Sequence, residues 1–335
     1  MTETLNVSEK PALVLVNLGT PKSPTTKDVR TYLREFLLDR RVIELNPLVW
    51  RPILEGIILR TRPAKSAAAY RKVWMEQGSP LMHYTVAQAT MLQDRLGDEV
   101  VVRPAMRYGQ PALGTVLDEL YEAGHRRVVV LPDYPQYSCT TVASIMDVVA
   151  DWMKSHRDQL EFRTVRSFPT SQAYIEALAV AVEDSWAKNG RPDFGAGDRL
   201  ITSFHGIPLS MHEDGDPYRS ECEATAKLLE QRLALPDGAL QVTFQSVFGP
   251  AEWLKPATID TVSEMGASGV GRVDVICPGF MADCLETLEE IDIQNREAFM
   301  DAGGREFHYI QWGNDSEGAV TALQEQAERS LAGWL

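Results

Sequence analysis

Short apolar runs alternate along the chain with longer segments of helical period. The runs have the length and β-branched content of buried strands, whereas the other segments repeat apolar residues every three to four positions. The expected strands are Ala12–Val16, Val100–Val102, Val128–Leu131, Glu161–Val165, Leu200–Ser203, Gln241–Gln245 and Val273–Cys277. The expected helices include Thr140–Lys154, Gln172–Ala187, Glu221–Leu233, Pro256–Met265 and Glu317–Leu331. This βαβ rhythm predicts an α/β fold of doubly wound parallel sheets with helices on both faces.

A chain of 335 residues has the length of about two domains. Two sets of about four strands favour two Rossmann-like lobes, each a parallel sheet flanked by helices, over one continuous sheet. We place the N-terminal lobe at residues 10–160 and the C-terminal lobe at 161–312, and expect the last helix, about 315–335, to pack back on the first lobe. Ligands of open parallel sheets bind beyond the carboxyl ends of the strands, so residues that follow the apolar runs are the candidates for chemistry.

Composition excludes several classes of protein. The 47 acidic residues against 33 basic ones give a net charge of −14, which argues against a nucleic-acid binder. No stretch approaches the ~18 apolar residues of a membrane span, and the acidic start with its short apolar run does not resemble a secretory signal. No GxGxxG follows a strand and no GxxxxGK[ST] occurs, so a nucleotide cofactor is not indicated. The four cysteines form no CxxC pair, which favours reduced thiols in a cytoplasm.

His205 ends an apolar strand and is followed by the turn sequence Gly-Ile-Pro. An imidazole at a strand end can serve as a base or as a metal ligand. For a single histidine, however, a capping or core role is the more common explanation.

An acidic stripe elsewhere in the chain favours a functional role for His205 over a capping or core role. At ~100° per residue, Asp283, Glu286 and Glu290 fall on one face of a helix. The positive end of a helix explains the first acid and partly the second, but not a third acid two turns further on. If the strands before His205 and before this stripe are neighbours, the imidazole faces several carboxylates. Such a set suits a divalent metal that is handled but not permanently held, whereas a structural zinc site shows a closed set of Cys and His ligands.

An apolar stripe runs over residues 48–58 at helical spacing and is followed by basic residues. Most such stripes face a core. The functional interpretation is an apolar lip for a flat hydrophobic ligand or a membrane surface, with cations placed for carboxylates or headgroups. The candidate lip residues are Trp50, Ile53, Leu54, Ile57 and Arg62.

Seven motifs in order resemble those of the ferrochelatase family, which inserts ferrous iron into protoporphyrin. The resemblance extends from about Ala12 to Arg296. The motifs are VNLGTP (Val16–Pro21), YRKVW with GSPL (Tyr70–Leu81), LPDYPQYSCTTVAS (Leu131–Ser144), SFHGIP (Ser203–Pro208), GDPY with Cys222 (Gly215–Cys222), FQSVFGPAEWLKP (Phe244–Pro256) and PGFMADCLETLEEID (Pro278–Asp292).

The resemblance implies two packed lobes with porphyrin in an active cleft between them. It assigns the catalytic histidine to His205 and its acidic partner to Glu286, both also as metal contacts, and continues a proton or metal path to Asp283 and Glu290. An apolar Leu18 resembles the protoporphyrin-using branch, since the coproporphyrin-using branch tends to carry tyrosine there. The porphyrin-binding residues implied by motif are Leu18, Tyr70, Arg107, Tyr108, Tyr134, Tyr218 and Trp253.

The implied reaction is insertion of Fe²⁺ into protoporphyrin IX to give protohaem with release of two protons, the last step of haem biosynthesis. A neutral His205 would accept protons while Glu286 ligates iron, and the opposite assignment uses the same residues. One alternative is a chelatase for another tetrapyrrole or metal, such as a coproporphyrin iron or cobalt chelatase. The other is a two-lobed haem- or porphyrin-binding protein without catalysis.

Some positions depart from the family pattern. Asp133 stands where an apolar residue is usual, and Val247 and Pro250 replace commonly basic residues. Members with an iron–sulfur cluster draw most ligands from a cysteine-bearing extension, and no Cys follows Cys284, so we expect no cluster and no permanently bound cofactor. We also expect a cytoplasmic monomer with peripheral contact to the inner face of the cell membrane.

Overall fold

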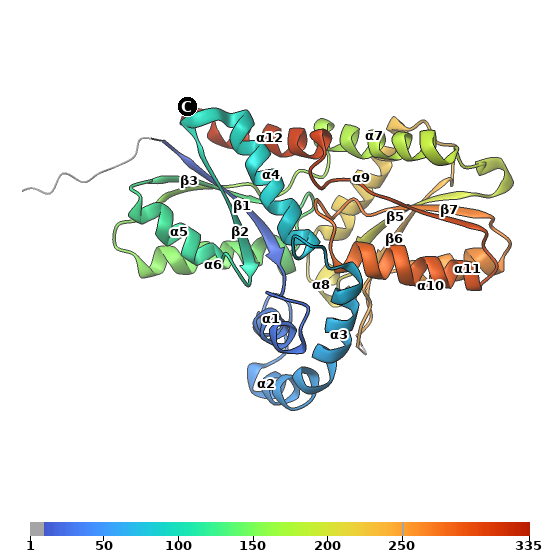
Figure 1. Cartoon of the computed structure of the whole chain (residues 1–335), viewed down its shortest axis with the longest axis horizontal. Coiled ribbons are helices and arrows are strands. Elements are labelled where there is room, and N and C mark those ends of the chain that lie inside the picture. Colours follow the sequence, from blue (N-terminus) through green and yellow to red (C-terminus); the bar gives the residue numbers. More distant parts are fainter. Residues whose placement is uncertain (1–9, 250) are drawn as a thin grey trace, which may run out of the picture. The chain divides into compact units, whose positions relative to one another are not determined.

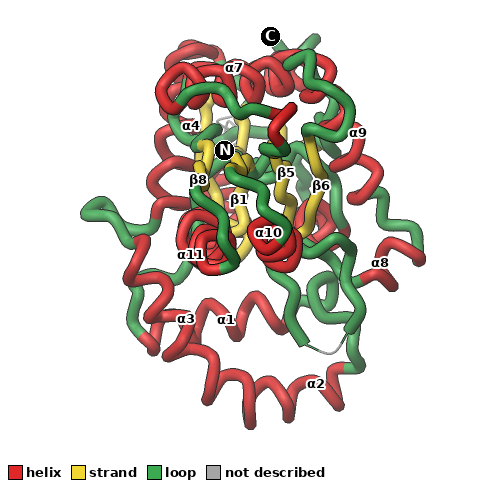
Figure 2. Tube along the Cα trace, turned by 90° about the vertical axis from the view of Figure 1, so that its right-hand side faces the viewer, coloured by secondary structure: helices red, strands yellow, loops and turns green. Residues whose placement is uncertain are grey.

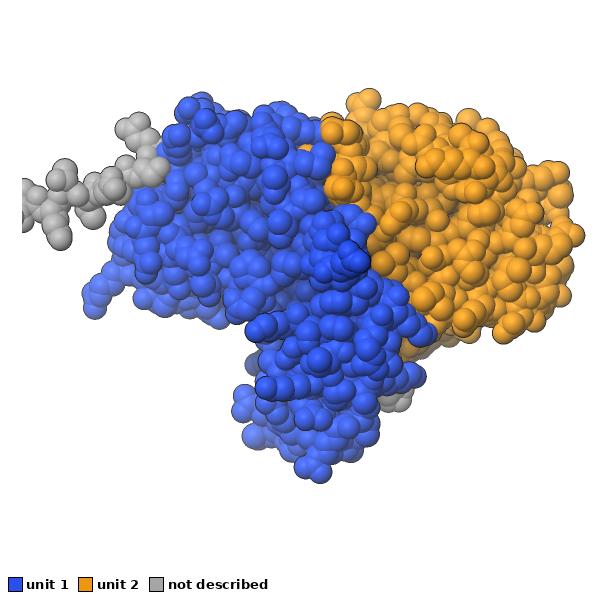
Figure 3. Space-filling model, in the orientation of Figure 1, with its two compact units in different colours: residues 1–167, 323–335 blue, residues 168–322 orange. Residues whose placement is uncertain are grey.

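The computed structural model describes residues 10–249 and 251–335. Pro250 and the nine N-terminal residues, on which the secretory-signal prediction partly rests, lie outside the described residues. The chain divides into two compact units, coloured separately in Figure 3. Unit 1 comprises the described residues up to Ser167 together with Leu323–Leu335, and unit 2 is Phe168–Ala322.

Unit 1 is built on a four-stranded parallel sheet in the order β2-β1-β3-β4. Its strands are β1 (Ala12–Gly19), β2 (Val101–Tyr108), β3 (Arg127–Pro132) and β4 (Glu161–Thr164). Residues 12–16 of β1 are fully buried, as expected for a central strand covered on both faces. Strand β4 pairs with β3 from Arg127↔Glu161 to Val130↔Thr164. The division between units therefore follows this strand, whereas the sequence-based boundary at 160/161 precedes it.

Helices cover both faces of this sheet (Figure 1). Apolar residues of α5 and α6 pack on one face in a cluster with β1 and β3, while α4 contacts β1 and β2 from the other face. The helical segments are α1 (Thr26–Leu38), α2 (Pro47–Ile53), the π-helical η1 (Leu54–Ile58), α3 (Leu59–Val73), α4 (Pro80–Leu96), the 3₁₀ turn η2 (Gly97–Glu99), α5 (Leu113–Glu122), the π-helical η3 (Cys139–Ala143) and α6 (Ser144–Ser155). The last helix, α12 (Glu317–Leu331), ends in unit 1, where Arg163 donates to the carbonyl oxygens of Ser330 and Ala332 at 2.8 Å each.

Unit 2 repeats the same strand order in a second parallel sheet, β6-β5-β7-β8. Its strands are β5 (Arg199–His205), β6 (Leu240–Gln245), β7 (Arg272–Ile276) and β8 (Glu306–Ile310). The α/β class, with two four-stranded parallel sheets, is confirmed. Strand β8 was not among the expected strands, because this edge strand mixes polar and apolar residues and lacks the continuous apolar run of a central strand.

The second sheet is also covered on both faces. Figures 1 and 2 show α10 and α11 along one face and α7 along the other. The helical segments are α7 (Gln172–Asn189), the 3₁₀ turn η4 (Phe194–Ala196), α8 (Leu209–Glu213), α9 (Tyr218–Arg232), α10 (Thr258–Ala267), the π-helical η5 (Glu286–Asn295) and α11 (Arg296–Asp301).

In each sheet the first strand is central, and the next two strands along the chain lie on opposite sides of it. The direction of strand order therefore switches between β1 and β3 in the first sheet and between β5 and β7 in the second. The crevice at the carboxyl ends of two such strands is where ligands of open parallel sheets bind. In unit 2 this switch point lies between the end of β5, at His205, and the loop that follows β7.

Candidate active site

His205 lies at the switch point of unit 2. Its strand β5 pairs with β7 from Arg199↔Val273 to Thr202↔Ile276, so the two strands are neighbours, as the pairing of His205 with the acidic segment requires. The ring nitrogen Nδ1 lies 2.6 Å from the carbonyl oxygen of Gly206. Because a carbonyl only accepts hydrogen bonds, this contact assigns the proton to Nδ1 and leaves the lone pair of a neutral imidazole on Nε2. The ring therefore presents a base or ligand atom at Nε2.

The acidic segment does not form the α-helical stripe that the sequence predicts. Residues 286–295 form the π-helix η5, with hydrogen bonds five residues apart, and Asp283 precedes the helix. The expected stripe assumed that the helix begins at Asp283 and turns by 100° per residue. Instead the helix begins after Asp283, and it has π-helical geometry. Glu286 and Glu290 remain together on η5, both half-buried, and Glu290 interacts electrostatically with both Glu286 and His205.

Glu290 is held by the loop after β6. Both its oxygens accept hydrogen bonds from Ser246, Oε1 from the backbone N–H at 2.6 Å and Oε2 from the hydroxyl at 2.5 Å. Burial raises the pKa of Glu290, and the charge of Glu286 raises it further. The Ser246 hydrogen bonds lower the pKa, as does the positive charge of His205 when its ring is protonated. The net effect is a raised pKa. These effects mean that Glu290, Glu286 and His205 interact electrostatically in one centre.

Glu286 opens the π-helix and is bonded on two sides. Its backbone carbonyl accepts a hydrogen bond from the Gln245 side chain at 2.8 Å. The thiol of Cys284 donates to its carboxylate, and burial together with the charge of Glu286 raises the pKa of that thiol well above its usual value. Cys284 is therefore a neutral thiol at physiological pH and donates a hydrogen bond to the Glu286 carboxylate.

Asp283 is buried, and its carboxylate is fully engaged. Oδ1 accepts from the hydroxyls of Thr287 at 2.7 Å and Tyr309 at 2.6 Å, and Oδ2 accepts from the amides of Gln311 at 2.7 Å and Asn314 at 2.8 Å. Four donors therefore satisfy the two oxygens of this buried carboxylate. They also tie the loop before η5 to the end of β8 and the segment after it. A role of Asp283 in a metal or proton path stays a prediction.

Within the described residues, no three His, Cys, Asp or Glu side chains are grouped closely enough to hold a metal ion.

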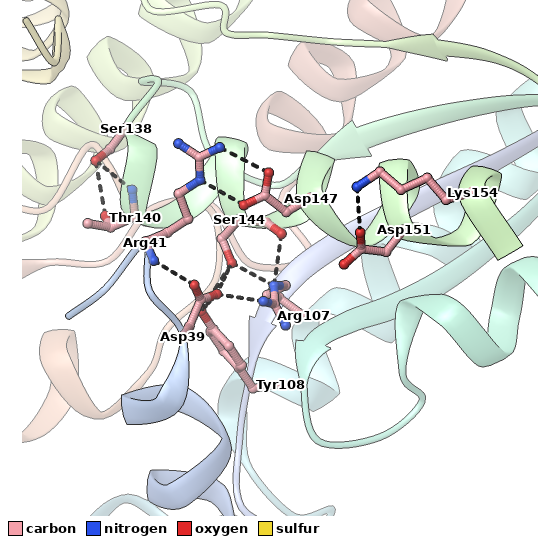
Figure 4. Close-up of polar contacts among 10 residues, drawn as sticks. All are labelled: Asp39, Arg41, Arg107, Tyr108, Ser138, Thr140, Ser144, Asp147, Asp151 and Lys154. Atoms are coloured by element: carbon pink, nitrogen blue, oxygen red, sulfur yellow. Dashed lines mark hydrogen bonds and ion pairs between the residues drawn. The ribbon is translucent and has the colours of Figure 1, made fainter. Parts of the chain in front are cut away.

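In unit 1, the predicted porphyrin-binding residues Arg107 and Tyr108 belong to a polar cluster around Asp39 (Figure 4). Asp39 Oδ2 accepts from Arg107 at 2.5 Å, from the Tyr108 hydroxyl at 2.8 Å and from the Ser144 hydroxyl at 2.5 Å. Burial raises the pKa of Asp39, but Ser144, the Arg41 backbone N–H, Tyr108 and Arg107 together lower it below its usual value. Tyr108 is fully buried, and its hydroxyl is directed at this cluster.

The remaining predicted lining residues of unit 1 lie in different elements. Leu18 is half-buried near the end of β1, and its backbone N–H donates to the Asn17 side chain. Tyr134 follows β3 and packs against the core cluster of that sheet face. Tyr70 is buried in α3, with its ring edge-on to Trp74 at 6.0 Å between centroids.

In unit 2, Trp253 supports the loop that carries His205. Its indole donates to the Phe248 carbonyl at 2.9 Å, and a Cβ placed on Gly206 would lie only 3.2 Å from its ring. Tyr218, the first residue of α9, is also buried and shares a side-chain hydrogen bond with Cys222. Both rings therefore pack inside unit 2 and expose little of their surface.

The apolar stripe is split between the interior and the surface. Leu54 is fully buried with Leu37 and Leu59, and Trp50 and Ile53 are half-buried. By contrast, Ile57 is 58% exposed and Arg62 is exposed. Leu48 and Val49, at the start of the same stripe, are 85% and 58% exposed. In the part of the chain that the structure describes, no helix is long and apolar enough to cross a bilayer.

Two residues of these centres received no role from the sequence. Asp39 follows α1 directly, and only its long-range contact with β2 reveals its role. Ser246 lies inside the FQSVFGPAEWLKP motif, one residue beyond β6. The strand-end rule selects this segment, but only the structure shows that Ser246 contacts Glu290. Of the positions that depart from the family pattern, Val247 is 48% exposed and Asp133 is buried.

Comparisons with known proteins give one consistent family. A family model described as ferrochelatase matches residues 10–331. The ferrochelatase of Dechloromonas aromatica is 48% identical over 326 residues, which cover 96% of this chain and 88% of the relative. The ferrochelatase of Methylibium petroleiphilum is 49% identical over 330 residues, covering 98% and 90%.

Solved structures with a similar fold are more distant in sequence. SirB from Bacillus subtilis with Fe³⁺ aligns with a TM-score of 0.54 at 12% identity over 96% of both chains. The sirohydrochlorin chelatase SirB from Bacillus subtilis subspecies spizizenii, in complex with cobalt, aligns with a TM-score of 0.55 at 11% identity over 97% of both chains. At these identities the likeness concerns the fold alone.

Proposed function

Because this chain belongs to the ferrochelatase family, we propose that it inserts Fe²⁺ into protoporphyrin IX with His205 and Glu286 at the reacting centre. The observation that carries the assignment is the pairing of β5 with β7, which brings His205 beside the π-helix of Glu286 and Glu290. An imidazole beside two carboxylates combines a proton acceptor with oxygen ligands for a divalent ion.

The reaction requires groups that accept protons from the porphyrin and a group that delivers iron to it. A free-base porphyrin carries two inner N–H protons, and both must leave as Fe²⁺ binds the four nitrogens. We assign the first acceptor role to Nε2 of His205, which is supported by the hydrogen bond between Nδ1 and Gly206. Glu286 presents iron to the ring, and Glu290 takes part in moving protons or iron between the centre and solvent.

The porphyrin is proposed to be protoporphyrin rather than a more carboxylated ring. The apolar side chain of Leu18 supports this choice, since it offers no ligand or hydrogen bond. Comparing kcat/KM for protoporphyrin IX and coproporphyrin III tests it. A preference for coproporphyrin would contradict the proposal.

The principal experiment is anaerobic incubation of the protein with protoporphyrin IX and Fe²⁺, followed by the porphyrin absorption spectrum. We expect the free-base spectrum to disappear with wild type and with Glu297→Gln, an exposed acid on α11. His205→Ala and Glu286→Gln should bind porphyrin without inserting iron. If Glu286→Gln loses iron affinity and His205→Ala keeps it, the base role belongs to His205; the reverse result exchanges the two roles. Binding without insertion by wild type would indicate a carrier.

We propose a peripheral membrane contact through the exposed apolar residues of α2 and η1 at the inner face of the cell membrane. Leu48, Val49 and Ile57 are exposed beside basic residues such as Arg62, a combination that suits an anionic lipid surface. Co-sedimentation with anionic liposomes should fall in Leu48→Ser/Val49→Ser. Val180→Ser, which changes an exposed valine on α7, is the control and should bind as wild type.

We further propose that the protein works as a monomer without a resident iron–sulfur cluster or other bound cofactor. Metal analysis of the purified protein should find no stoichiometric iron with acid-labile sulfide, and sedimentation should give one chain of 37.4 kDa. A visible cluster spectrum or a concentration-independent dimer would contradict the respective statement.

A further inference from the structure

Ser246 has an unusual backbone conformation for its residue type. It follows β6 directly with φ of +65°, in the left-handed region that glycine adopts freely and other residues rarely adopt. A side chain retained at such a position signals that the surrounding structure holds it there for a reason other than local preference. The reason is visible in its contacts with Glu290.

In this conformation, both donors of Ser246 point at one carboxylate. The backbone N–H contacts Glu290 Oε1 at 2.6 Å, and the hydroxyl contacts Oε2 at 2.5 Å. Hydrogen bonds to an ionised acceptor are short and strong, and two of them on separate oxygens fix the plane of the carboxylate. A carboxylate has about four acceptor positions, so two remain for a proton or a metal ion.

Gln245, the residue before Ser246, links the loop after β6 to Glu286 and to Gly206, the neighbour of His205. The Gln245 side chain donates to the Glu286 carbonyl at 2.8 Å, and the Gln245 carbonyl accepts from the Gly206 N–H at 2.7 Å. A Cβ on Gly206 would lie 2.8 Å from that carbonyl, so the two loops approach as closely as glycine allows. The position of Ser246 is thereby fixed relative to His205 and Glu286.

We propose that Ser246 is a positioning residue for metal insertion, which acts by holding the Glu290 carboxylate in the orientation that faces His205 and Glu286. The inference rests on the proposed function. Ser246 contacts Glu290 and acts on iron transfer through it. Loss of the hydroxyl therefore frees one carboxylate oxygen and impairs the handling of the metal ion, while the porphyrin contacts of the protein stay as they are.

Ser246→Gly is the decisive variant. Glycine keeps the backbone N–H and favours a positive φ, so the change removes the hydroxyl without straining the loop. Loss of one hydrogen bond to a charged group corresponds to roughly a tenfold effect. We expect kcat/KM for Fe²⁺, and for Zn²⁺ as a surrogate, to fall about tenfold, with an unchanged KM and dissociation constant for protoporphyrin.

Two further variants separate positioning from folding. Ala234→Gly relieves a positive φ of +48° at the end of α9, away from the centre, and should behave as wild type. Ser246→Asn keeps a side-chain donor on a residue that tolerates the left-handed region, and should recover part of the metal kcat/KM. Wild-type metal kinetics in Ser246→Gly, or an equal loss in porphyrin binding, would overturn the inference. Absence of insertion by wild type itself would instead overturn the proposed function and the inference with it.

Discussion

The guanidinium of Arg107 donates to the carboxylate of Asp39 at 2.5 Å and so joins the end of β2 to the residue that follows α1. The side chains are only 17% and 7% exposed, and Tyr108 and Ser144 complete the shell of the carboxylate. A predicted porphyrin contact is thus oriented by an acid 68 residues away in sequence.

Asp39→Asn should destabilise unit 1 and disturb the Arg107 side chain. Removing one partner of a buried pair leaves the other charge uncompensated, which costs about 3 kcal/mol. Urea unfolding measures this effect, and the KM for porphyrin should rise as Arg107 loses its fixed position.

The matched control is Asp147→Asn, which breaks the neighbouring pair with Arg41. Those side chains are 47% and 45% exposed, so the change should cost less than about 1 kcal/mol. Equal effects in the two variants would contradict the distinction between a buried and a surface pair.

Asp133 should make stability depend on pH. It accepts a hydrogen bond from Asn17 at 2.9 Å, its other oxygen has no hydrogen-bond partner, and burial raises its pKa from 3.8 to about 7. Between these values the folded state keeps a proton that the unfolded state has lost, so the free energy of unfolding decreases as pH rises from about 4 to about 7 and levels off above. A difference of about three between the two pKa values corresponds to about 4 kcal/mol.

The check is urea unfolding of wild type and Asp133→Asn at pH 5 and pH 8. The difference in unfolding free energy between the two proteins should change by about 2–3 kcal/mol over this range, in favour of the variant at pH 8. A constant difference would show that Asp133 is ionised in the folded protein throughout.

Asp283→Asn should cost stability, because the new amide nitrogen meets groups that are themselves donors. Gln311, Asn314 and Tyr309 all donate to this carboxylate, and an unsatisfied buried donor costs about 1–3 kcal/mol. We expect a loss of about 2–3 kcal/mol by thermal or urea unfolding.

Asp292→Asn is the comparison, on the π-helix η5 that follows Asp283. This acid pairs with Arg296 at a partly exposed position and should contribute about 0.5 kcal/mol or less. Insertion activity measured at low temperature then separates the two roles of Asp283. Full activity in folded Asp283→Asn would remove it from the proton and metal path.

The four cysteines should differ in reactivity. Cys222, Cys277 and Cys284 are buried, and burial raises the pKa of each thiol well above its usual value, whereas Cys139 is only half-buried. Brief iodoacetamide treatment of the native protein at pH 8 should therefore label Cys139 first. Peptide mass spectrometry should find this label, and Cys139→Ser should abolish the fast phase; rapid labelling of Cys284 would contradict its burial beside Glu286.

Much of the fold could be predicted because buried parallel strands and their helices leave a periodic trace in the chain. The central strand of each sheet was found, at Ala12–Val16 and Leu200–Ser203, since each is apolar on both faces. Edge strand β8 was missed because one of its flanks faces no other strand and tolerates polar residues. His205 and Glu286 could be named because each follows a recognisable strand and motif.

The sequence by itself determined the fold class, the strand-end position of His205, the acidic motif after β7 that carries Glu286, and the family, since all of these depend on local pattern and motif order. Only the tertiary structure decided which residues hold these groups. Asp283 lies before the π-helix η5 and so is not part of the expected stripe. Ser246, 44 residues earlier at the end of β6, donates hydrogen bonds to Glu290, and Asp39 orients Arg107. These contacts join segments far apart in the chain, and a local pattern carries no information about which distant donor a carboxylate will find.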